Sequence, residues 1–426
     1  MTRTAKILDL LSYMSDLGQR AALAKNIIRL ATAEQRSNAI KAMAHEIRIR
    51  AEEIETANKE DMIAAESKGL SAAMLDRLKL DQNRISAIAD SLDAIAALPD
   101  PVGEIMDSWT QPNGLKFEKR RIPIGVIGMI YESRPNVTAD AGALCVKSGN
   151  ACILRGGSES LKSSTALYKA IQAGLVNAGL PADAVQMIET SDRAAVGHLL
   201  GGLSGVVDLI IPRGGKNLIA RVQQDARVPV LSHLEGLCHS YVDGAADIAK
   251  AQEIVMNAKL RRTGVCGSTE TLLVDEKIAE DFLPDMFARL IEGGCEIRGD
   301  ENSRALNPDV KTATPTDYAT EHLAPIINVA FVDGVNGAIA HIAQYGSGHT
   351  DAIITEDNDA AEQFSREVDS AIIMRNASTQ FADGGEFGFG AEIGIATGRL
   401  HARGPVGAQH LTTYKYVVLG DGHTRP

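Results

Sequence analysis

Residues 122–157, IPIGVIGMIYESRPNVTADAGALCVKSGNACILRGG, decide the fold class of this chain. The pattern predicts an apolar strand over 122–131, a helix that ends at Gly149, and a second apolar strand over 150–157. Because neither strand alternates between apolar and polar residues, both faces of the sheet are expected to be covered. The order strand, helix, strand therefore indicates an α/β fold built on a parallel sheet.

The strand–helix alternation continues toward the C-terminus, whereas the N-terminal region differs from it. Residues 1–98 carry Ala, Leu and Ile at helical spacing with little glycine, which predicts helices. A second α/β block is expected over 269–395. Further strands are expected over 184–189, 207–215, 228–236, 269–275, 326–333, 351–356 and 371–377.

Composition limits the classes of function. The chain has 426 residues, enough for two or more domains, and a formal net charge of −12, which argues against a nucleic-acid or anionic membrane surface. Its apolar runs are shorter than the about 20 residues that span a bilayer, and the N-terminus does not have the pattern of a secretory signal. The five cysteines form no C-x-x-C pair and no zinc-ligand spacing, so we expect reduced thiols, no bound metal and a cytoplasmic location.

One cysteine lies on a glycine-flanked turn, where its thiol is expected to be accessible. In the segment RRTGVCGSTETLLV, Cys266 follows Gly264 by two positions and precedes Gly267. Glycine on both sides permits a tight backbone and the close approach of another group. Cys266 is therefore the candidate nucleophile, whereas Cys145 and Cys152 are interpreted as core thiols.

A glycine pair marks a candidate phosphate contact. Gly214 and Gly215 lie between an expected strand and a helix expected over 216–226, where backbone N–H groups can bind an anion. The dinucleotide fingerprint G-x-G-x-x-G and the spacing G-x-x-x-x-G-K-[ST] are both absent from this region. A plain glycine turn at the start of a helix fits the pattern equally well.

Four segments carry a family resemblance. They are residues 122–160, HLEGLCHSYVD, NAKLRRTGVCGSTETLLVD and NASTQFADGGEFGFGAEIGIATGRLHARGPVGAQHLTTYKYVVLGDG. Together they resemble the γ-glutamyl phosphate reductases of the aldehyde dehydrogenase superfamily, and the resemblance extends over essentially the whole chain. It implies NADPH-dependent reduction of L-glutamyl 5-phosphate to L-glutamate 5-semialdehyde with release of phosphate. This is the second step of proline biosynthesis from glutamate, and it proceeds through a cysteine thioester.

The resemblance also implies a domain organisation. Residues 1–104 and 123–235 are expected to form a cofactor-binding domain, with the N-terminal helices and a Rossmann-like sheet. Residues 236–405 are expected to form the catalytic domain with the nucleophilic cysteine. Residues 105–122 and 406–426 are expected to form a small β element that mediates oligomerisation, so a homo-oligomer is expected.

Individual residues receive roles through the same resemblance. Cys266 takes the position of the catalytic cysteine, and its backbone N–H together with Asn136 is expected to stabilise the oxyanion. Glu321 matches the glutamate that holds the nicotinamide ribose. Arg155 and Ser158 match the region that contacts the adenosine ribose, where an arginine and a small hydroxyl favour NADPH over NADH.

Several assignments stay open. Ser133, and not Asn136, lies closest to the position of the side-chain oxyanion donor in hydrolytic relatives. Glu235 lies near the general base of those relatives, and a structural role fits it equally well. Cys238 is ambiguous, and Glu159 weakens the argument for NADPH. The candidates for binding the amino-acid end of the substrate include Arg375, Asn376, Ser378 and His349.

Two other functions are compatible with the same fold. A hydrolytic aldehyde dehydrogenase would use the same thiol and cofactor, with water in place of phosphate. A non-catalytic binding member of the fold would not need the chemistry of Cys266. The expected partner is a small-molecule substrate, and transient contact with a glutamate 5-kinase is a further hypothesis because acyl phosphates are labile.

Overall fold

The computed structural model describes residues 3–425, with side chains described from residue 9 onward except at 72 and 73. Contacts divide the chain into two units. Unit 1 runs to Ser232 and includes Gly388–Gly394 and the chain from Val406, whereas unit 2 comprises His233–Phe387 and Ile395–Pro405. Within the described residues, no helix is both long enough and apolar enough to cross a membrane.

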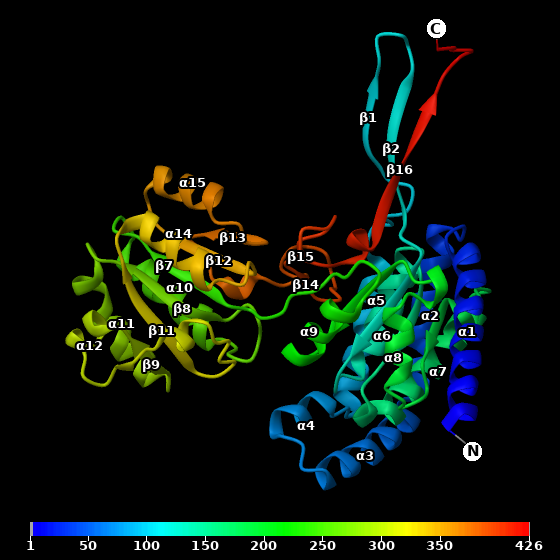
Figure 1. The fold of residues 1–426 in the computed structure, drawn as a ribbon, viewed down its shortest axis with the longest axis horizontal. Coiled ribbons are helices and arrows are strands. Elements are labelled where there is room, and N and C mark those ends of the chain that lie inside the picture. The colour runs from blue at the N-terminus through cyan, green and yellow to red at the C-terminus, as the bar shows by residue number, and fades with distance from the viewer. Residues whose placement is uncertain (1–2, 426) are drawn as a thin grey trace. The chain divides into compact units, whose positions relative to one another are not determined.

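Unit 1 contains the helices and strands of the N-terminal half (Figure 1). Its elements are α1 (Arg3–Ile28), α2 (Ala33–Ile49), α3 (Ala51–Ser67), α4 (Ala72–Leu78), α5 (Gln82–Ala97), β1 (Ile105–Thr110), β2 (Lys116–Pro123), β3 (Val126–Tyr131), α6 (Asn136–Lys147), β4 (Ala151–Arg155), α7 (Leu161–Asn177), β5 (Val185–Met187), α8 (Ala194–Leu200), β6 (Leu209–Arg213), α9 (Lys216–Asp225) and β16 (Thr412–Leu419).

The parallel sheet of unit 1 is built from the stretch that opens the sequence argument. Its order is β5–β4–β3–β6, and every pairing in it is parallel. The central strand β3 is buried throughout. Helix α6 ends where predicted, because Gly149 adopts φ +74° and the N–H of Asn150 donates back into the last turn at 2.8 Å. The predicted α/β fold class is therefore confirmed.

One strand predicted for this sheet is not formed. Residues 228–236 make only an isolated bridge, from Val230 to Ile210 beside β6. Pro229 lacks the N–H that a continuing ladder needs, so the segment stays an edge contact.

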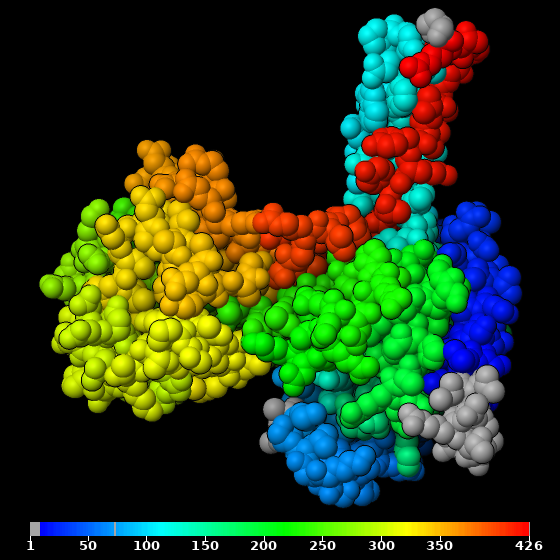
Figure 2. Space-filling model, in the orientation of Figure 1, coloured from blue at the N-terminus to red at the C-terminus, as the bar shows by residue number. Residues whose placement is uncertain are grey.

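Strands β1, β2 and β16 form an antiparallel sheet in which β2 is central. The register between β2 and β16 runs from Pro123↔Thr412 to Lys116↔Leu419. Trp109 stacks on Phe117, with ring centroids 5.4 Å apart. Figures 1 and 2 show this arm standing away from the helices of unit 1. The two segments that the sequence placed in one β element thus pair within one chain, and their role in oligomerisation stays a prediction.

Unit 2 contains the remaining elements. They are β7 (Cys238–Val242), α10 (Ile248–Leu260), β8 (Thr269–Asp275), α11 (Ala279–Glu292), β9 (Glu296–Gly299), α12 (Glu301–Leu306), β10 (Lys311–Thr312), α13 (Pro315–Tyr318), β11 (Ile326–Val332), α14 (Gly334–Tyr345), β12 (Thr350–Ile354), α15 (Asn358–Glu367), β13 (Ile372–Arg375), β14 (Ile395–Ala396) and β15 (Gly404–Pro405).

The main sheet of unit 2 is parallel and buried on both faces. Its order is β10–β9–β11–β8–β7–β12–β13. Alternate side chains of β8 enter two different cores: Leu272 and Val274 pack with α10 and α11, whereas Leu273 packs with α14 and α15. Figure 1 shows these two helix layers on opposite sides of the strands. The position of β8 therefore fixes the loop that precedes it, which carries Cys266.

Unit 2 ends at Pro405, the residue predicted as the end of the catalytic domain, but one segment inside the predicted range lies outside this unit. Residues 388–394 pack with unit 1 instead. Gly390 has φ +75°, and a Cβ placed there would lie 2.5 Å from Cδ2 of Leu98. The N–H of Ile393 donates to the carbonyl of Val406 at 2.9 Å. This glycine-rich segment has no apolar periodicity, so no pattern in it predicts that it packs with unit 1.

Substituting Gly174 tests the helix packing of unit 1. A Cβ at Gly174 in α7 would lie 2.4 Å from the backbone nitrogen of Met43 in α2. Because a backbone atom cannot rotate away, Gly174→Ala is expected to lower the free energy of unfolding by about 1–3 kcal/mol. Gly197→Ala in α8 is the matched control, because nothing lies within 4 Å of its added Cβ. It is expected to be neutral or to stabilise by up to about 1 kcal/mol. Equal midpoints in urea unfolding would contradict the predicted contact.

Candidate active site

The sequence-predicted site residues fall in both units. Cys266 and Glu321 lie in unit 2, and the others lie in unit 1. Those in unit 1 are Asn136, Arg155, Ser158, Gly214 and Gly215.

Cys266 differs from the other cysteines in its exposure. All five cysteines lie in the described part of the chain; Cys266 is half-buried and the other four are buried. Its loop joins α10 to β8. Arg261 and Arg262, at the end of α10, are exposed. Only the Cys266 thiol combines a loop position with access from outside the core.

The residue that presses most closely on this loop is Gly236. A Cβ at Gly236 would lie 2.1 Å from the carbonyl oxygen of Cys266. Of the glycines that flank the cysteine, Gly267 approaches the carbonyl of Thr379, whereas nothing lies within 4 Å of a Cβ at Gly264. The close backbone approach predicted for this cysteine therefore exists, and the residue that permits it is a glycine thirty positions earlier in the chain.

Cys238 supports the same loop. Its Sγ donates to the carbonyl oxygen of Cys266 at 3.1 Å. Burial raises the pKa of Cys238 well above its ordinary value, so this thiol stays protonated and able to donate. The residue that the sequence left ambiguous is thus a hydrogen-bond donor to the nucleophile's own backbone.

Two carboxylates organise the loops next to the thiol. Oε1 of Glu321 accepts the N–H of Gly236 at 3.0 Å. Glu270 accepts the N–H of Leu323 at 3.2 Å and the ammonium of Lys259 at 2.8 Å. Burial raises the pKa of Glu270 to about 7, although the Lys259 charge acts against this rise. In this structure Glu321 therefore binds the backbone beside Cys266.

Two histidines lie close to the thiol. One ring nitrogen of His233, one of His349 and the Sγ of Cys266 all lie within 4.8 Å of one another. Burial lowers the pKa of His349 to about 3, so its imidazole is neutral at physiological pH. The sequence interpretation considered His349 only as a candidate for binding the amino-acid end of the substrate, and it did not single out His233.

In unit 1 Asn136 begins α6, and side-chain contacts hold both it and the loop before it. Nδ2 of Asn136 donates to Asp140 at 3.1 Å. Ser133 is buried with φ +42°, and both its backbone N–H and its hydroxyl donate to Glu159 at 2.7 Å. Glu159, which weakened the argument for NADPH, therefore has its carboxylate engaged by Ser133.

Arg155 and Ser158 differ in exposure. Arg155 is buried and donates to the carbonyl of Gly156, and its Nε has no hydrogen-bond partner in the described part of the chain. Burial lowers the pKa of Arg155, which Glu159 partly offsets. Ser158 is exposed just after β4. A buried cation with an unpaired N–H beside an exposed hydroxyl is suited to an anionic ligand.

The glycine pair at α9 already binds a carboxylate of the chain. The N–H of Gly215 donates to Oε2 of Glu132 at 2.8 Å. A Cβ at Gly214 would lie 2.5 Å from the same oxygen. The N-terminus of α9 thus binds an anion, and a cofactor phosphate would have to displace Glu132 from it.

The candidates for binding the amino-acid end of the substrate make local contacts. Both ends of the Asn376 amide bond the backbone of Thr355 at 2.9 Å, and Ser378 caps the following 3-10 turn. Arg375 is exposed and donates to Asn358 at 2.7 Å. These contacts account for Asn376 and Ser378 as residues that shape the chain.

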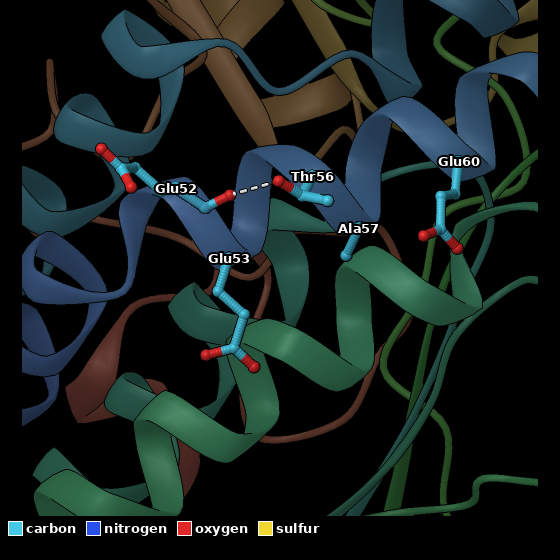
Figure 3. Close-up of a pocket in the computed structure, with 5 residues that line it drawn as sticks. All are labelled: Glu52, Glu53, Thr56, Ala57 and Glu60. Atoms are coloured by element: carbon cyan, nitrogen blue, oxygen red, sulfur yellow. Dashed lines mark hydrogen bonds between the residues drawn. The ribbon is translucent and has the colours of Figure 1, made fainter.

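One surface hollow contains none of the predicted site residues. It lies on α3, has a volume of about 410 Å³, and is lined by Glu52, Glu53, Thr56, Ala57 and Glu60. Figure 3 shows the side chains that line it. Thr56 donates to the carbonyl of Glu52 within the helix at 2.8 Å. Its acidic rim has no nucleophile, so it is a feature of a solvated helix face.

Known proteins are similar to this chain in sequence and in fold. A model of the aldehyde dehydrogenase family matches residues 15–292. The γ-glutamyl phosphate reductase of Caulobacter vibrioides is 62% identical over 413 residues, covering 97% of this chain and 100% of the relative. That of Hyphomonas neptunium is 59% identical, covering 97% and 96%. The crystal structure of the γ-glutamyl phosphate reductase of Thermotoga maritima matches with a TM-score of 0.94 and 44% identity, covering 97% of this chain and 100% of that one.

The contact between Gly236 and Cys266 can be tested by adding one methyl group. Gly236→Ala is expected to push the Cys266 backbone away by about an ångström. The displaced thiol should lower the turnover rate of the enzyme, which depends on Cys266 as nucleophile, about 100-fold. Gly264→Ala is the matched control, because its Cβ meets nothing within 4 Å, and it is expected to keep turnover within about twofold. The two variants are compared by turnover and by urea midpoint. Equal turnover in both would show that the contact does not position the thiol.

Proposed function

The chain belongs to the aldehyde dehydrogenase family and, within it, to the γ-glutamyl phosphate reductases, and we propose that Cys266 is the nucleophile of its reaction. The activity of this group is the reduction of L-glutamyl 5-phosphate to L-glutamate 5-semialdehyde with release of phosphate, in proline biosynthesis. The observation that carries the assignment to Cys266 is its exposure: the other four cysteines are buried.

The Cys266 thiol allows covalent catalysis: it displaces phosphate from the substrate and forms a thioester, which hydride can then reduce. The Cys266 thiolate attacks the acyl carbon, an S–C bond forms, and the C–O bond to phosphate breaks with its electron pair leaving on phosphate. Addition of hydride to the thioester carbon would give a thiohemiacetal anion, whose collapse breaks the S–C bond and releases the aldehyde and the Cys266 thiolate. Because phosphate leaves in the first step, the reverse reaction requires phosphate to resolve the thioester.

The residues around Cys266 hold the nucleophile in place during these steps. Gly236 lies against its backbone, and Cys238 donates to its carbonyl. These contacts fix the loop without using the thiol itself. The Cys266 N–H and Asn136 are proposed to stabilise the oxyanion, with Asn136 resting on the family resemblance alone.

The family uses a nicotinamide cofactor, and we propose NADPH for this chain. When bound, it supplies the hydride. Arg155 and Ser158 would hold its 2′-phosphate, because Arg155 is a cation with an unpaired buried N–H and Ser158 offers an exposed hydroxyl. Glu321 would hold the nicotinamide ribose through its carboxylate. Gly214 and Gly215 would meet a phosphate once Glu132 moves.

The sequence also predicts a cytoplasmic homo-oligomer that contacts a glutamate 5-kinase transiently. Support for the oligomer comes from the exposed side chains of the β1–β2–β16 arm, among them Tyr416 and Val418. These three statements are proposals about the setting of the enzyme, and the chemistry at Cys266 does not depend on them.

The phosphate requirement decides between the two catalytic alternatives. With glutamate semialdehyde and NADP⁺, the protein is expected to form NADPH only when inorganic phosphate is present. Cys266→Ala is expected to lower this rate at least about 1,000-fold, because the covalent step is lost. Cys295→Ala, which alters a buried thiol in the core of unit 2, is the control and should retain the rate. Reduction without phosphate would instead identify a hydrolytic aldehyde dehydrogenase, in which Glu235 could act as the base.

The preference for NADPH can be tested at one exposed position. Ser158→Asp places a carboxylate near the proposed 2′-phosphate and is expected to lower kcat/KM for NADPH about tenfold, through charge repulsion, with little change for NADH. Ser158→Asn is the uncharged control of similar size. An equal loss with both cofactors would remove Ser158 from the 2′-phosphate site.

A further inference from the structure

Three ligand-type atoms meet at the nucleophile. The Sγ of Cys266 and one ring nitrogen from each of His233 and His349 lie within 4.8 Å of one another, all in unit 2. The proposed mechanism uses the thiol and leaves both imidazoles without a task. The two histidines lie 33 positions before and 83 positions after Cys266 in the sequence, so no local spacing announces the cluster.

A backbone carbonyl orients the ring of His233. Its Nδ1 lies 2.8 Å from the carbonyl oxygen of Ile395. Since a carbonyl only accepts, Nδ1 carries the proton and Nε2 keeps its lone pair. A ring N–H fixed by a backbone carbonyl is the usual second contact of a histidine that binds a metal.

His349 supplies an independent observation, a buried nitrogen that no described protein group satisfies. Its ring is fully buried, and Nδ1 lies 2.9 Å from the hydroxyl of Thr350 and 3.5 Å from the Sγ of Cys238. Its Nε2 is buried and, among the described residues, has no hydrogen-bond partner. A buried polar atom without a hydrogen-bond partner lowers the stability of the folded protein unless a ligand satisfies it.

We propose that His233, Cys266 and His349 form a binding site for Zn²⁺ or a divalent cation of similar softness, which blocks the nucleophile while it is bound. Imidazole nitrogen and thiolate sulfur are the ligands that zinc prefers, and three protein ligands leave a fourth position for water. Bonds of about 2.0–2.3 Å place tetrahedral ligands roughly 3.3–3.8 Å apart. The three atoms therefore move together by about an ångström on binding, and His233 lies in a segment without regular secondary structure.

Binding exchanges a proton for the metal. Cys266 releases its thiol proton to solvent, a coordinate bond forms between sulfur and zinc, and no atom changes its oxidation state. A sulfur held by zinc cannot attack an acyl phosphate, so activity stops until a chelator removes the ion. The inhibition rests on the proposed role of Cys266, whereas the binding itself does not.

Cobalt titration of the full chain tests the site without reference to activity. Co²⁺ added to the reduced protein is expected to bind one ion per chain and to give the charge-transfer absorption of a thiolate–cobalt bond. Cys266→Ala should abolish this band, and His233→Gln should weaken binding at least about tenfold. His45→Gln, on an exposed histidine of α2 in unit 1, is the matched control and should bind as the parent does. Absence of the band, its survival in Cys266→Ala, or equal weakening in both histidine variants would overturn the proposal.

An activity measurement separates this proposal from the proposed function. In the phosphate-dependent assay, Zn²⁺ is expected to lower the rate at least about tenfold, and a chelator to restore it. If the cobalt band forms but the protein has no phosphate-dependent activity, the metal site stands and the proposed function fails. If the activity is present and the band is absent, the metal site fails and the proposed function stands.

Discussion

Gly236 and Cys266 touch through their backbones, and the arrangement of unit 2 around the thiol depends on this contact. With a Cβ only 2.1 Å from the Cys266 carbonyl oxygen, any other residue at 236 would force the two segments apart. The N–H of Gly236 donates to Glu321, and the next residue but one, Cys238, donates to the Cys266 carbonyl. One missing side chain thus permits a short segment to support the nucleophile and to bind the carboxylate proposed for the cofactor ribose.

Behind this segment, a buried ion pair connects the cysteine loop to the core. Lys259 lies in the last turn of α10, Glu270 lies in β8, and both are almost fully buried. Burial of a pair costs desolvation free energy that its attraction only partly offsets, which agrees with the raised pKa of Glu270. The pair also orders the segment at Leu323, where the backbone adopts φ +52°. The Lys259–Glu270 ion pair therefore contributes more to the positioning of these loops than to the net free energy of folding.

In unit 1, as in unit 2, some residues are proposed to bind the cofactor and others hold the backbone around them in place. The carboxylates of Glu132 and Glu159 each bind backbone N–H groups, at Gly215 and at Ser133. Both lie beside residues proposed for the cofactor, so the chain's own anions shape that region. The sequence showed Glu159 only as a charge that opposed a 2′-phosphate. Its hydrogen bonds to Ser133 came from a backbone with positive φ, which no local pattern in the sequence indicates.

The sequence by itself determined the α/β class, the parallel sheets and the cysteine that acts as the candidate nucleophile, because apolar periodicity and glycine positions are local properties of the chain. It also carried the motifs that identify the family. The tertiary structure decided which distant residues meet: Gly236 and Cys238 against Cys266, Glu132 at Gly215, and two histidines beside the thiol. The tertiary structure also decided that residues 388–394 pack with unit 1. Contacts of this kind depend on where separate strands and loops pack in space, and sequence spacing does not encode that.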